Sequence, residues 1–230
     1  MSDGQIQEMT AHYFALITHI DSQVGRMLDR LDERGLADDT LVVFISDHGE
    51  LLGDHGFTEK VMMYEPSVRV PWMMRWPNGM PRGQRIQTPV SGVDLVPTLL
   101  ELTGVGQPEP LDGRSLAADL RASRQPAAQP VFAEIASERA LQGDDDPQQL
   151  AGHVMVRDGR YKYVWNRFDV DELYDLAADP DEMSNLAGAG DQTARIAELR
   201  RVIGQMVERT GPGPYAWCVP GEGAAAGERE

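Results

Sequence analysis

The chain has 230 residues, a formal net charge of −16 at pH 7 and a single cysteine. This acidic balance argues against nucleic-acid binding, which needs a basic face to replace the counterions of the phosphates. One cysteine cannot form an internal disulfide, no apolar run is long enough to span a bilayer, and the first residues do not resemble a secretory signal. We therefore expect no membrane partner and a cytoplasmic location.

The first half of the chain alternates between helical and strand patterns. Apolar side chains at helical spacing predict one amphipathic helix over residues 6–34. The continuous apolar run Leu41–Ile45 predicts a strand buried on both faces, as in a parallel sheet. A second core strand is expected near 68–74 and a helix over 95–103. This alternation predicts an α/β fold with a partial, mostly parallel sheet and flanking helices.

The second half is rich in short alternating segments. Asp158-Gly159 lies between two of them and is a strong hairpin signal. A small C-terminal α+β subdomain, with an antiparallel sheet and one packed helix, is therefore expected. Its predicted elements are strands at 131–135, 153–157 and 161–165, and a final helix with Ile196, Leu199, Val202, Ile203, Met206 and Val207 on one face.

These patterns divide the chain into three parts. Residues 1–125 form the α/β core, and residues 126–210 form the antiparallel-sheet subdomain. Residues 211–230 are rich in Gly and Pro and are expected to be a flexible tail.

The candidate site follows the first strand, where Leu41–Ile45 stops at Ser46-Asp47-His48-Gly49. Open α/β sheets bind ligands at the carboxyl ends of their strands. Asp47 offers the hard oxygen that Ca²⁺ or Mg²⁺ prefers, and His48 offers a nitrogen better suited to Mn²⁺ or Zn²⁺. Both side chains can reach one metal only if the chain turns here, which Gly49 permits. The alternative is a turn whose side chains cap a following helix.

Two further residues of the same loop carry chemistry. Lys60 lies twelve residues after His48, and an ammonium beside a divalent cation suits an oxyanion ester. The alternative for Lys60 is an ordinary surface lysine. His55 lies in a Gly-flanked stretch, where it contacts substrate or is simply a hydrogen-bonded loop histidine.

Four motifs in this order resemble the sulfatases of the alkaline phosphatase superfamily. The first motif runs over residues 46–71 and comprises S-D-H-G-E-x-L-G-D-H-G at 46–56, Lys60 and Y-E-x-S-x-R-V-P at 64–71. The stretches 90–104, 157–165 and 172–187 (ELYDLAADPDEMSNLA) are also similar to that family. Together the resemblance covers the chain from about Tyr13 to about Thr210.

The chain departs from the family pattern at its nucleophile. Sulfatases carry a C/S-x-P-x-R motif, whose Cys or Ser becomes formylglycine, and a pair of acidic metal ligands near the amino terminus. Neither is present in this sequence, and Cys218 is followed by Val219-Pro220-Gly221 with no arginine. The chain therefore resembles roughly the C-terminal half of a sulfatase.

The resemblance implies metal-dependent hydrolysis of a small-molecule sulfate ester. In that scheme Asp47 and His48 bind the metal, Lys60 binds sulfate and assists catalysis, and His55 contacts substrate. Ca²⁺ is the expected metal, and Mn²⁺ and Mg²⁺ are compatible with the same ligands. The nucleophile must come from elsewhere, so little turnover is expected of the chain alone.

Two alternatives remain at this point. One is a phosphonate monoester or phosphodiester hydrolase, since the same three residues serve either ester. The other is a non-catalytic chain that complements a separate N-terminal half. A sheet cut open in this way would expose an apolar face for that half, or for self-association.

Overall fold

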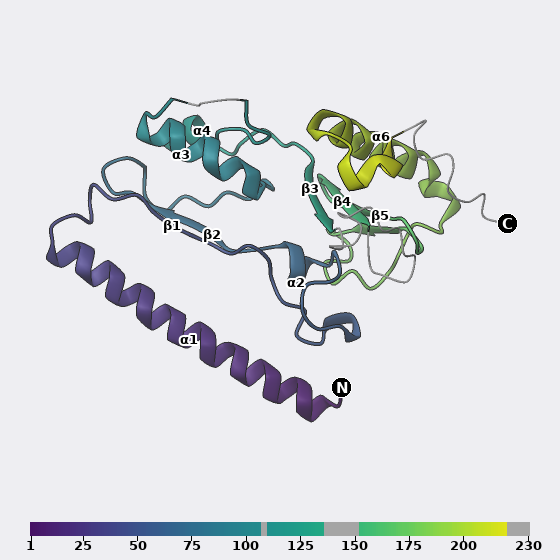
Figure 1. Cartoon of the computed structure of the whole chain (residues 1–230), viewed down its shortest axis with the longest axis horizontal. Coiled ribbons are helices and arrows are strands. Elements are labelled where there is room, and N and C mark those ends of the chain that lie inside the picture. Colours follow the sequence, from purple (N-terminus) through teal and green to yellow (C-terminus); the bar gives the residue numbers. More distant parts are fainter. Residues whose placement is uncertain (107–109, 136–151, 220–230) are drawn as a thin grey trace. The chain divides into compact units, whose positions relative to one another are not determined.

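The computed structural model describes residues 1–106, 110–135 and 152–219, and it divides the chain into two compact units (Figure 1). The first unit comprises Met1–Gln87, Leu95–Pro110 and Arg114–Pro126. The second comprises Thr88–Asp94, Leu111–Gly113 and Ala127–Glu230. Among the described residues, no helix has both the length and the apolar composition needed to cross a bilayer.

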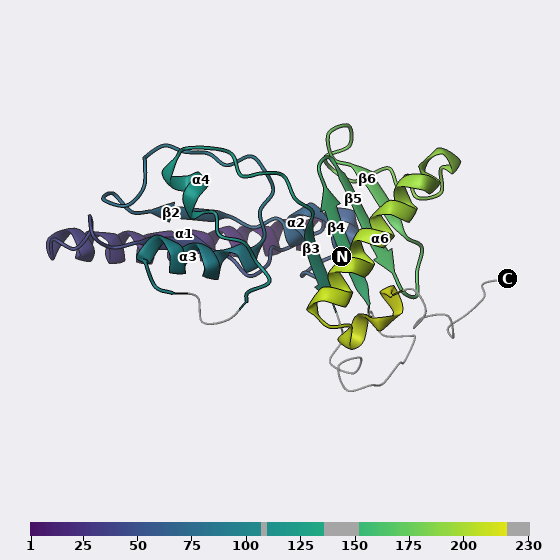
Figure 2. The ribbon, with the colours of Figure 1, turned by 90° about the horizontal axis from the view of Figure 1, so that it is seen from above.

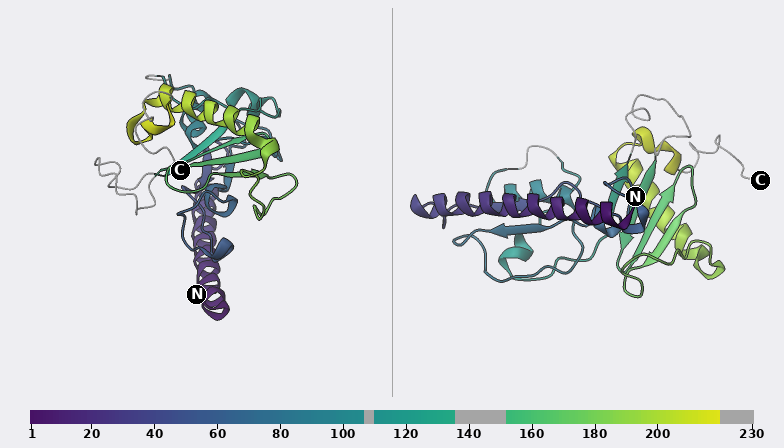
Figure 3. Two further views of the ribbon diagram at one scale, coloured as in Figure 1. Left: turned by 90° about the vertical axis from the view of Figure 1, so that its right-hand side faces the viewer. Right: turned by 90° about the horizontal axis from the view of Figure 1, so that it is seen from below.

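The first unit begins with a long helix, α1 (Asp3–Glu33), which runs unbroken in Figure 3. It starts three residues earlier than the apolar spacing predicts because Ser2 and Gln5 form a capping box, in which each side chain meets the other's backbone N–H. No residue of α1 is buried. Its apolar side chains that are exposed in the described chain include Phe14, Leu16, Ile17, Ile20 and Met27.

Two short strands form the sheet of the first unit. β1 (Val42–Ile45) pairs with β2 (Trp72–Arg75), and Phe44 lies opposite Met73 in the register. The pairing is antiparallel, in contrast to the predicted mostly parallel sheet. Parallel neighbours need a crossover that returns the chain to the same edge, whereas the loop between β1 and β2 brings the chain back in the opposite direction. The predicted burial of β1 on both faces also differs, since none of its residues is buried and Phe44 is 37% exposed.

Short helices complete the first unit. The predicted helix at 95–103 is confirmed as α3 (Leu95–Thr103). The backbone N–H of Leu116 donates to the buried hydroxyl of Thr98 at 2.9 Å, which ties α3 to the start of the next helix. The other short elements are the 3-10 helix η1 (Asp54–Gly56), α2 (Glu65–Val68) and α4 (Ala117–Arg121).

The second unit is an antiparallel sheet crossed by one helix, as predicted. Its four strands lie in chain order, and β4 and β5 are joined at the predicted hairpin. Figure 2 shows α6 (Thr193–Thr210) lying across the sheet. The strands are β3 (Val131–Ile135), β4 (His153–Asp158), β5 (Tyr161–Asn166) and β6 (Glu172–Asp175).

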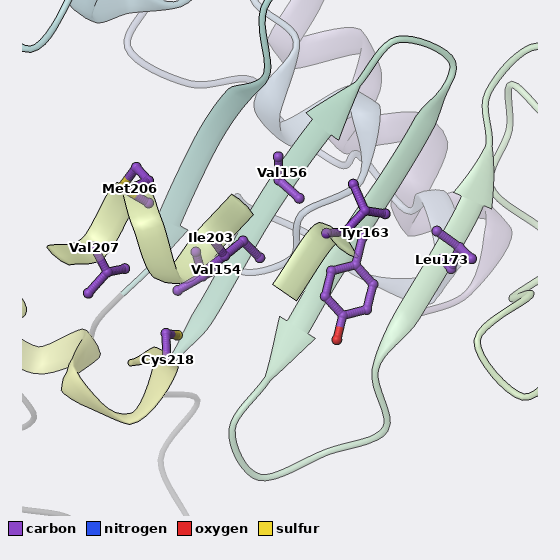
Figure 4. Close-up of a cluster of buried hydrophobic side chains, with 9 residues drawn as sticks. Val154, Val156, Tyr163, Leu173, Ile203, Met206, Val207 and Cys218 are labelled. Carbon is purple, nitrogen blue, oxygen red and sulfur yellow. The ribbon is translucent and has the colours of Figure 1, made fainter. Parts of the chain in front are cut away.

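The core of the second unit lies between α6 and the sheet. Side chains of α6 point toward those of β4, β5 and β6 in Figure 4. The predicted flexible tail is corrected in part, because Gly213–Cys218 forms a 3-10 helix, η4, and Cys218 is buried in this core. Residues 220–230 lie outside the described chain. The buried cluster consists of Val154, Val156, Tyr163, Leu173, Leu199, Ile203, Met206, Val207 and Cys218.

Candidate functional site

A tight turn after β1 sets the direction of the first two candidate residues. The Ser46 hydroxyl donates to the carbonyl of His48 at 2.8 Å, and the backbone N–H of His48 donates to Asp47 Oδ1 at 2.9 Å. Gly49 then passes so close to α2 that a Cβ there would lie 1.9 Å from the carbonyl oxygen of Pro66. Only glycine fits this approach, so the turn that the sequence analysis required at Gly49 is present.

The turn and the following loop bring three candidate side chains together. His48 Nε2 lies 3.5 Å from Asp47 Oδ2 and 2.6 Å from Lys60 Nζ. A carboxylate, an imidazole and an ammonium thus meet around one ring nitrogen. The side chains of Asp47 and His48 are 85% and 38% exposed.

Hydrogen bonds define the state of the His48 ring. Nδ1 lies 2.8 Å from the carbonyl of Gly49, which can only accept, so Nδ1 carries a proton. Nε2 then offers its lone pair to the ammonium of Lys60. This is the tautomer in which the Nε2 lone pair, here accepting from Lys60, could instead bind a cation.

The environment of Asp47 favours its charged form. The backbone N–H of His48 that donates to its carboxylate lowers the pKa of Asp47, and the nearby charge of Lys60 lowers that pKa further. Desolvation raises the pKa of Asp47, but the hydrogen bond from His48 is the larger cause and the net shift is downward. Asp47 is therefore an anionic donor over the whole neutral range.

The loop between His48 and Lys60 has an unusual backbone. Leu52, His55 and Glu59 adopt φ angles of +51°, +54° and +66°, a region that costs a residue with a side chain about 1 kcal/mol or more. Such conformations persist only where other contacts hold them. Glu50 supplies such contacts, because its Oε1 accepts hydrogen bonds from the backbone N–H groups of Leu52 and Glu59.

The structure does not bring His55 into the group around His48. Its ring stacks on that of Tyr64, with centroids 3.7 Å apart and planes 4° from parallel. The predicted substrate contact of His55 stays a prediction, and its observed partner is aromatic. Sequence reasoning missed both Tyr64 as this partner and Glu50 as the acceptor within the loop. The only sequence signal for Glu50 is its place directly after Asp-His-Gly.

The donor set offers part of a metal site. Asp47 and His48 present an oxygen and a nitrogen on one side of the turn, at a separation that two ligands of one ion can have. Within residues 1–106, 110–135 and 152–219, no group of three or more His, Cys, Asp or Glu side chains could hold a metal ion. The pair therefore fits as two ligands of a site that needs further donors.

Cys218, the single cysteine, is unsuited to be a nucleophile. Burial, followed by the charge of Glu134, raises the pKa of its thiol to about 12. The thiolate is the reactive form, so a buried thiol of this kind is inert at neutral pH.

Two family models match the chain. One, described as N-sulphoglucosamine sulphohydrolase, C-terminal, covers residues 53–209, and the other, type I phosphodiesterase / nucleotide pyrophosphatase, covers residues 10–65. The two matches overlap at the loop that carries Lys60.

Curated relatives with a similar sequence include sulfatases. The chain is 36% identical over 190 residues to a choline-sulfatase of Rhizobium meliloti, a match that covers 81% of this chain and 35% of the relative. It is 37% identical over 211 residues to an arylsulfatase K of Xenopus laevis, covering 90% of this chain and 38% of the relative. The chain thus spans between a third and two-fifths of the length of these relatives.

A solved structure of a related hydrolase has a similar fold. A phosphonate monoester hydrolase from Silicibacter pomeroyi superposes with a TM-score of 0.78 at 31% identity. The match covers 90% of this chain and 42% of that one. The predicted α/β class and the small antiparallel subdomain are confirmed by this likeness and by the elements described above.

Proposed function

This chain belongs to the sulfatase family of the alkaline phosphatase superfamily, and from that premise we propose that it takes part in the metal-dependent hydrolysis of sulfate esters. Its contribution is two metal ligands, Asp47 and His48, and a sulfate-binding lysine, Lys60. The observation that carries the proposal is the meeting of these three side chains around His48 Nε2.

Asp47 and His48 would hold a divalent cation through Oδ2 and Nε2. A bound cation would supply Lewis-acid chemistry by drawing charge from the sulfate oxygens. Ca²⁺ is the proposed ion because the depressed pKa of Asp47 keeps a hard anionic oxygen available. Mn²⁺ and Mg²⁺ suit the same pair. The remaining ligands would come from chain outside this sequence.

Lys60 would bind the sulfate group through its ammonium. Negative charge builds on the sulfate and on the departing alcohol oxygen as the ester bond breaks, and a fixed cation stabilises that charge. In the structure the same ammonium donates to His48 Nε2, which is the lone pair that a metal would take. With His48 Nε2 given to a cation, the ammonium of Lys60 would stay beside the metal pair and be available to bind the sulfate.

A phosphonate monoester or phosphodiester is the alternative substrate. Two observations favour it: the likeness to a phosphonate monoester hydrolase and the match to the phosphodiesterase family model. Both ester classes present tetrahedral anionic oxygens to a cation and an ammonium, so the three residues serve either one.

We also propose a polypeptide partner that carries the rest of the sulfatase fold and its nucleophile. Support comes from the share of the relatives that the chain covers and from apolar side chains exposed on the first unit. Phe44 and Met73 lie opposite each other on the β1–β2 ribbon, and Ile17 and Ile20 lie on α1. Exposed apolar groups on one unit suit burial by such a partner. Self-association through them is the competing outcome.

The test is hydrolysis of an aryl sulfate and of an aryl phosphonate monoester in the presence of Ca²⁺ or Mn²⁺. The chain is assayed alone and with a separately produced polypeptide that corresponds to the N-terminal portion of a sulfatase relative. We expect turnover of the sulfate only in the mixture. Lys60→Ala should lower that turnover by roughly a hundredfold or more, because a charge at the reacting group is lost.

The matched control is Arg69→Ala, which removes an exposed cation nine residues further along the chain. Equal loss in both variants would contradict a specific role for Lys60. Faster turnover of the phosphonate would favour the alternative substrate. Turnover by the chain alone that survives Lys60→Ala would contradict the proposal as a whole.

A further inference from the structure

We propose that Glu50 is a positioning residue that holds Lys60 against His48. The inference rests on the proposed role of Lys60, and it concerns how the loop delivers the ammonium rather than what the ammonium does. Glu50 directly follows the Asp47-His48-Gly49 turn, so it links the two halves of the site along the chain.

The carboxylate of Glu50 spans the loop. Its Oε1 accepts from the backbone N–H of Glu59 at 2.5 Å and from that of Leu52 at 3.3 Å. The backbone N–H of Leu51 adds a third bond by donating to the carbonyl of Glu59 at 2.9 Å. These hydrogen bonds join the two ends of the loop 51–59. Lys60 is the first residue after this closed loop.

The two N–H groups that donate to Glu50 belong to residues with a strained backbone. Leu52 and Glu59 have φ angles of +51° and +66°, which residues other than glycine rarely adopt. A hydrogen bond to the N–H of each residue resists relaxation to ordinary angles. If that bond is lost, relaxation at Glu59 redirects the chain one residue before Lys60.

The rest of the loop is anchored on α2. The N–H of Gly49 donates to Ser67 O at 2.7 Å, and that of Glu50 donates to Pro66 O at 3.0 Å. The buried hydroxyl of Ser67 donates to the carbonyl of Lys60 at 3.2 Å. Lys60 is thus held on one side by Ser67 and, through Glu59, on the other by Glu50.

The test measures the proximity of Lys60 to His48 directly and needs no turnover. At fixed neutral pH, a nuclear Overhauser effect between the Lys60 Hε protons and the His48 ring reports their contact. We expect it in the unmodified chain and in Glu50→Gln, whose amide oxygen keeps the acceptor. We expect its loss in Glu50→Ala, and also in Glu50→Asp, which keeps the charge but is one methylene too short to reach Glu59.

A matched control is Glu59→Gln, because the loop contacts of Glu59 described above use only its backbone. This variant should retain the contact between Lys60 and His48. Unchanged signals from α1, α3 and α4, which lie in the same unit as the loop, verify that the first unit remains folded in every variant. Since the Asp and Gln variants separate length from charge, the test does not depend on the stability of Glu50→Ala.

Retention of the contact in both Glu50→Ala and Glu50→Asp overturns the proposal, as does its absence from the unmodified chain or its loss in Glu50→Gln. A positioning role also predicts a coupling in the hydrolysing mixture. There Glu50→Asp should lower kcat at least tenfold with little change in KM, and should cost nothing further in a Lys60→Ala background. If the contact depends on Glu50 while Lys60→Ala leaves hydrolysis unchanged, the positioning stands and the proposed function fails.

Discussion

The chain contains the tripeptide Asp-His-Gly twice, seven residues apart, and the two copies have different structures. In the first copy, His48 turns toward Asp47 and Lys60, and its Nε2 meets both. In the second, His55 adopts a φ of +54° within η1 and lies flat on Tyr64. The same three residues thus form a polar cluster in one place and an aromatic stack in the other.

The difference comes from what surrounds each copy. The first follows β1 directly, and its glycine is pressed against the carbonyl of Pro66. The second lies within the loop, and a Cβ on its glycine would meet nothing within 4 Å. The strand that precedes an Asp-His-Gly motif and the helix that packs against it therefore decide whether it can form a metal pair. The sequence of the motif alone does not.

Replacing each aspartate by asparagine, in separate variants, gives the largest expected contrast between the two copies. In the hydrolysing mixture, Asp47→Asn should lower kcat/KM about a hundredfold or more, because the anionic donor to the cation is lost. Asp54→Asn should leave it unchanged, since Asp54 belongs to η1 and to the second copy, whose imidazole stacks on Tyr64. Initial rates at saturating Ca²⁺ measure both. Comparable losses in the two variants would mean that the copies share the site.

Alanine at each glycine separates the copies by stability. Gly49→Ala should destabilise the first unit by about 3 kcal/mol, since its Cβ would lie 1.9 Å from a backbone oxygen that cannot turn aside. Gly56→Ala should cost only about 1 kcal/mol, the strain of its φ of +81°. Urea unfolding, followed by the NMR signals of residues 42–75, gives both values. A larger cost at Gly56 would contradict the account of the turn.

Removing the second imidazole has the smallest expected effect. His55→Asn keeps a residue that tolerates the left-handed backbone but loses the stack on Tyr64, worth about 0.5–1.5 kcal/mol. Tyr64→Phe is the matched control, because it retains the ring and should retain the stack. The same urea unfolding measures the loss. Disappearance of the contact between Lys60 and His48 in His55→Asn would instead mean that His55 helps to hold the cluster around His48.

Features that depend on short stretches of sequence could be predicted. The helix at 95–103, the strand at 131–135 and the hairpin at Asp158-Gly159 follow from periodicity and turn chemistry within a few residues. The choice of Asp47, His48 and Lys60 as one group came from the family resemblance, and the structure places the three side chains together.

Features that depend on distant partners could not be predicted. The apolar run of β1 indicates burial without saying what buries it, and its antiparallel partner is decided by the path of a long loop. Glu50 acts on a backbone N–H nine residues away. The packing of Cys218 was hidden because its Gly- and Pro-rich surroundings are typical of a loose tail. β6 is only four residues long and was not expected as a strand.

Paramagnetic broadening by Mn²⁺ tests the proposed metal pair most directly, because the second copy is an internal control of identical chemistry. Substoichiometric Mn²⁺ is added to the chain while the ring signals of His48 and His55 are followed by NMR. We predict that His48 broadens first and that Asp47→Asn abolishes this preference while His55 is unchanged. Equal broadening of both rings, or earlier broadening of His55, would contradict the assignment of the metal to Asp47 and His48.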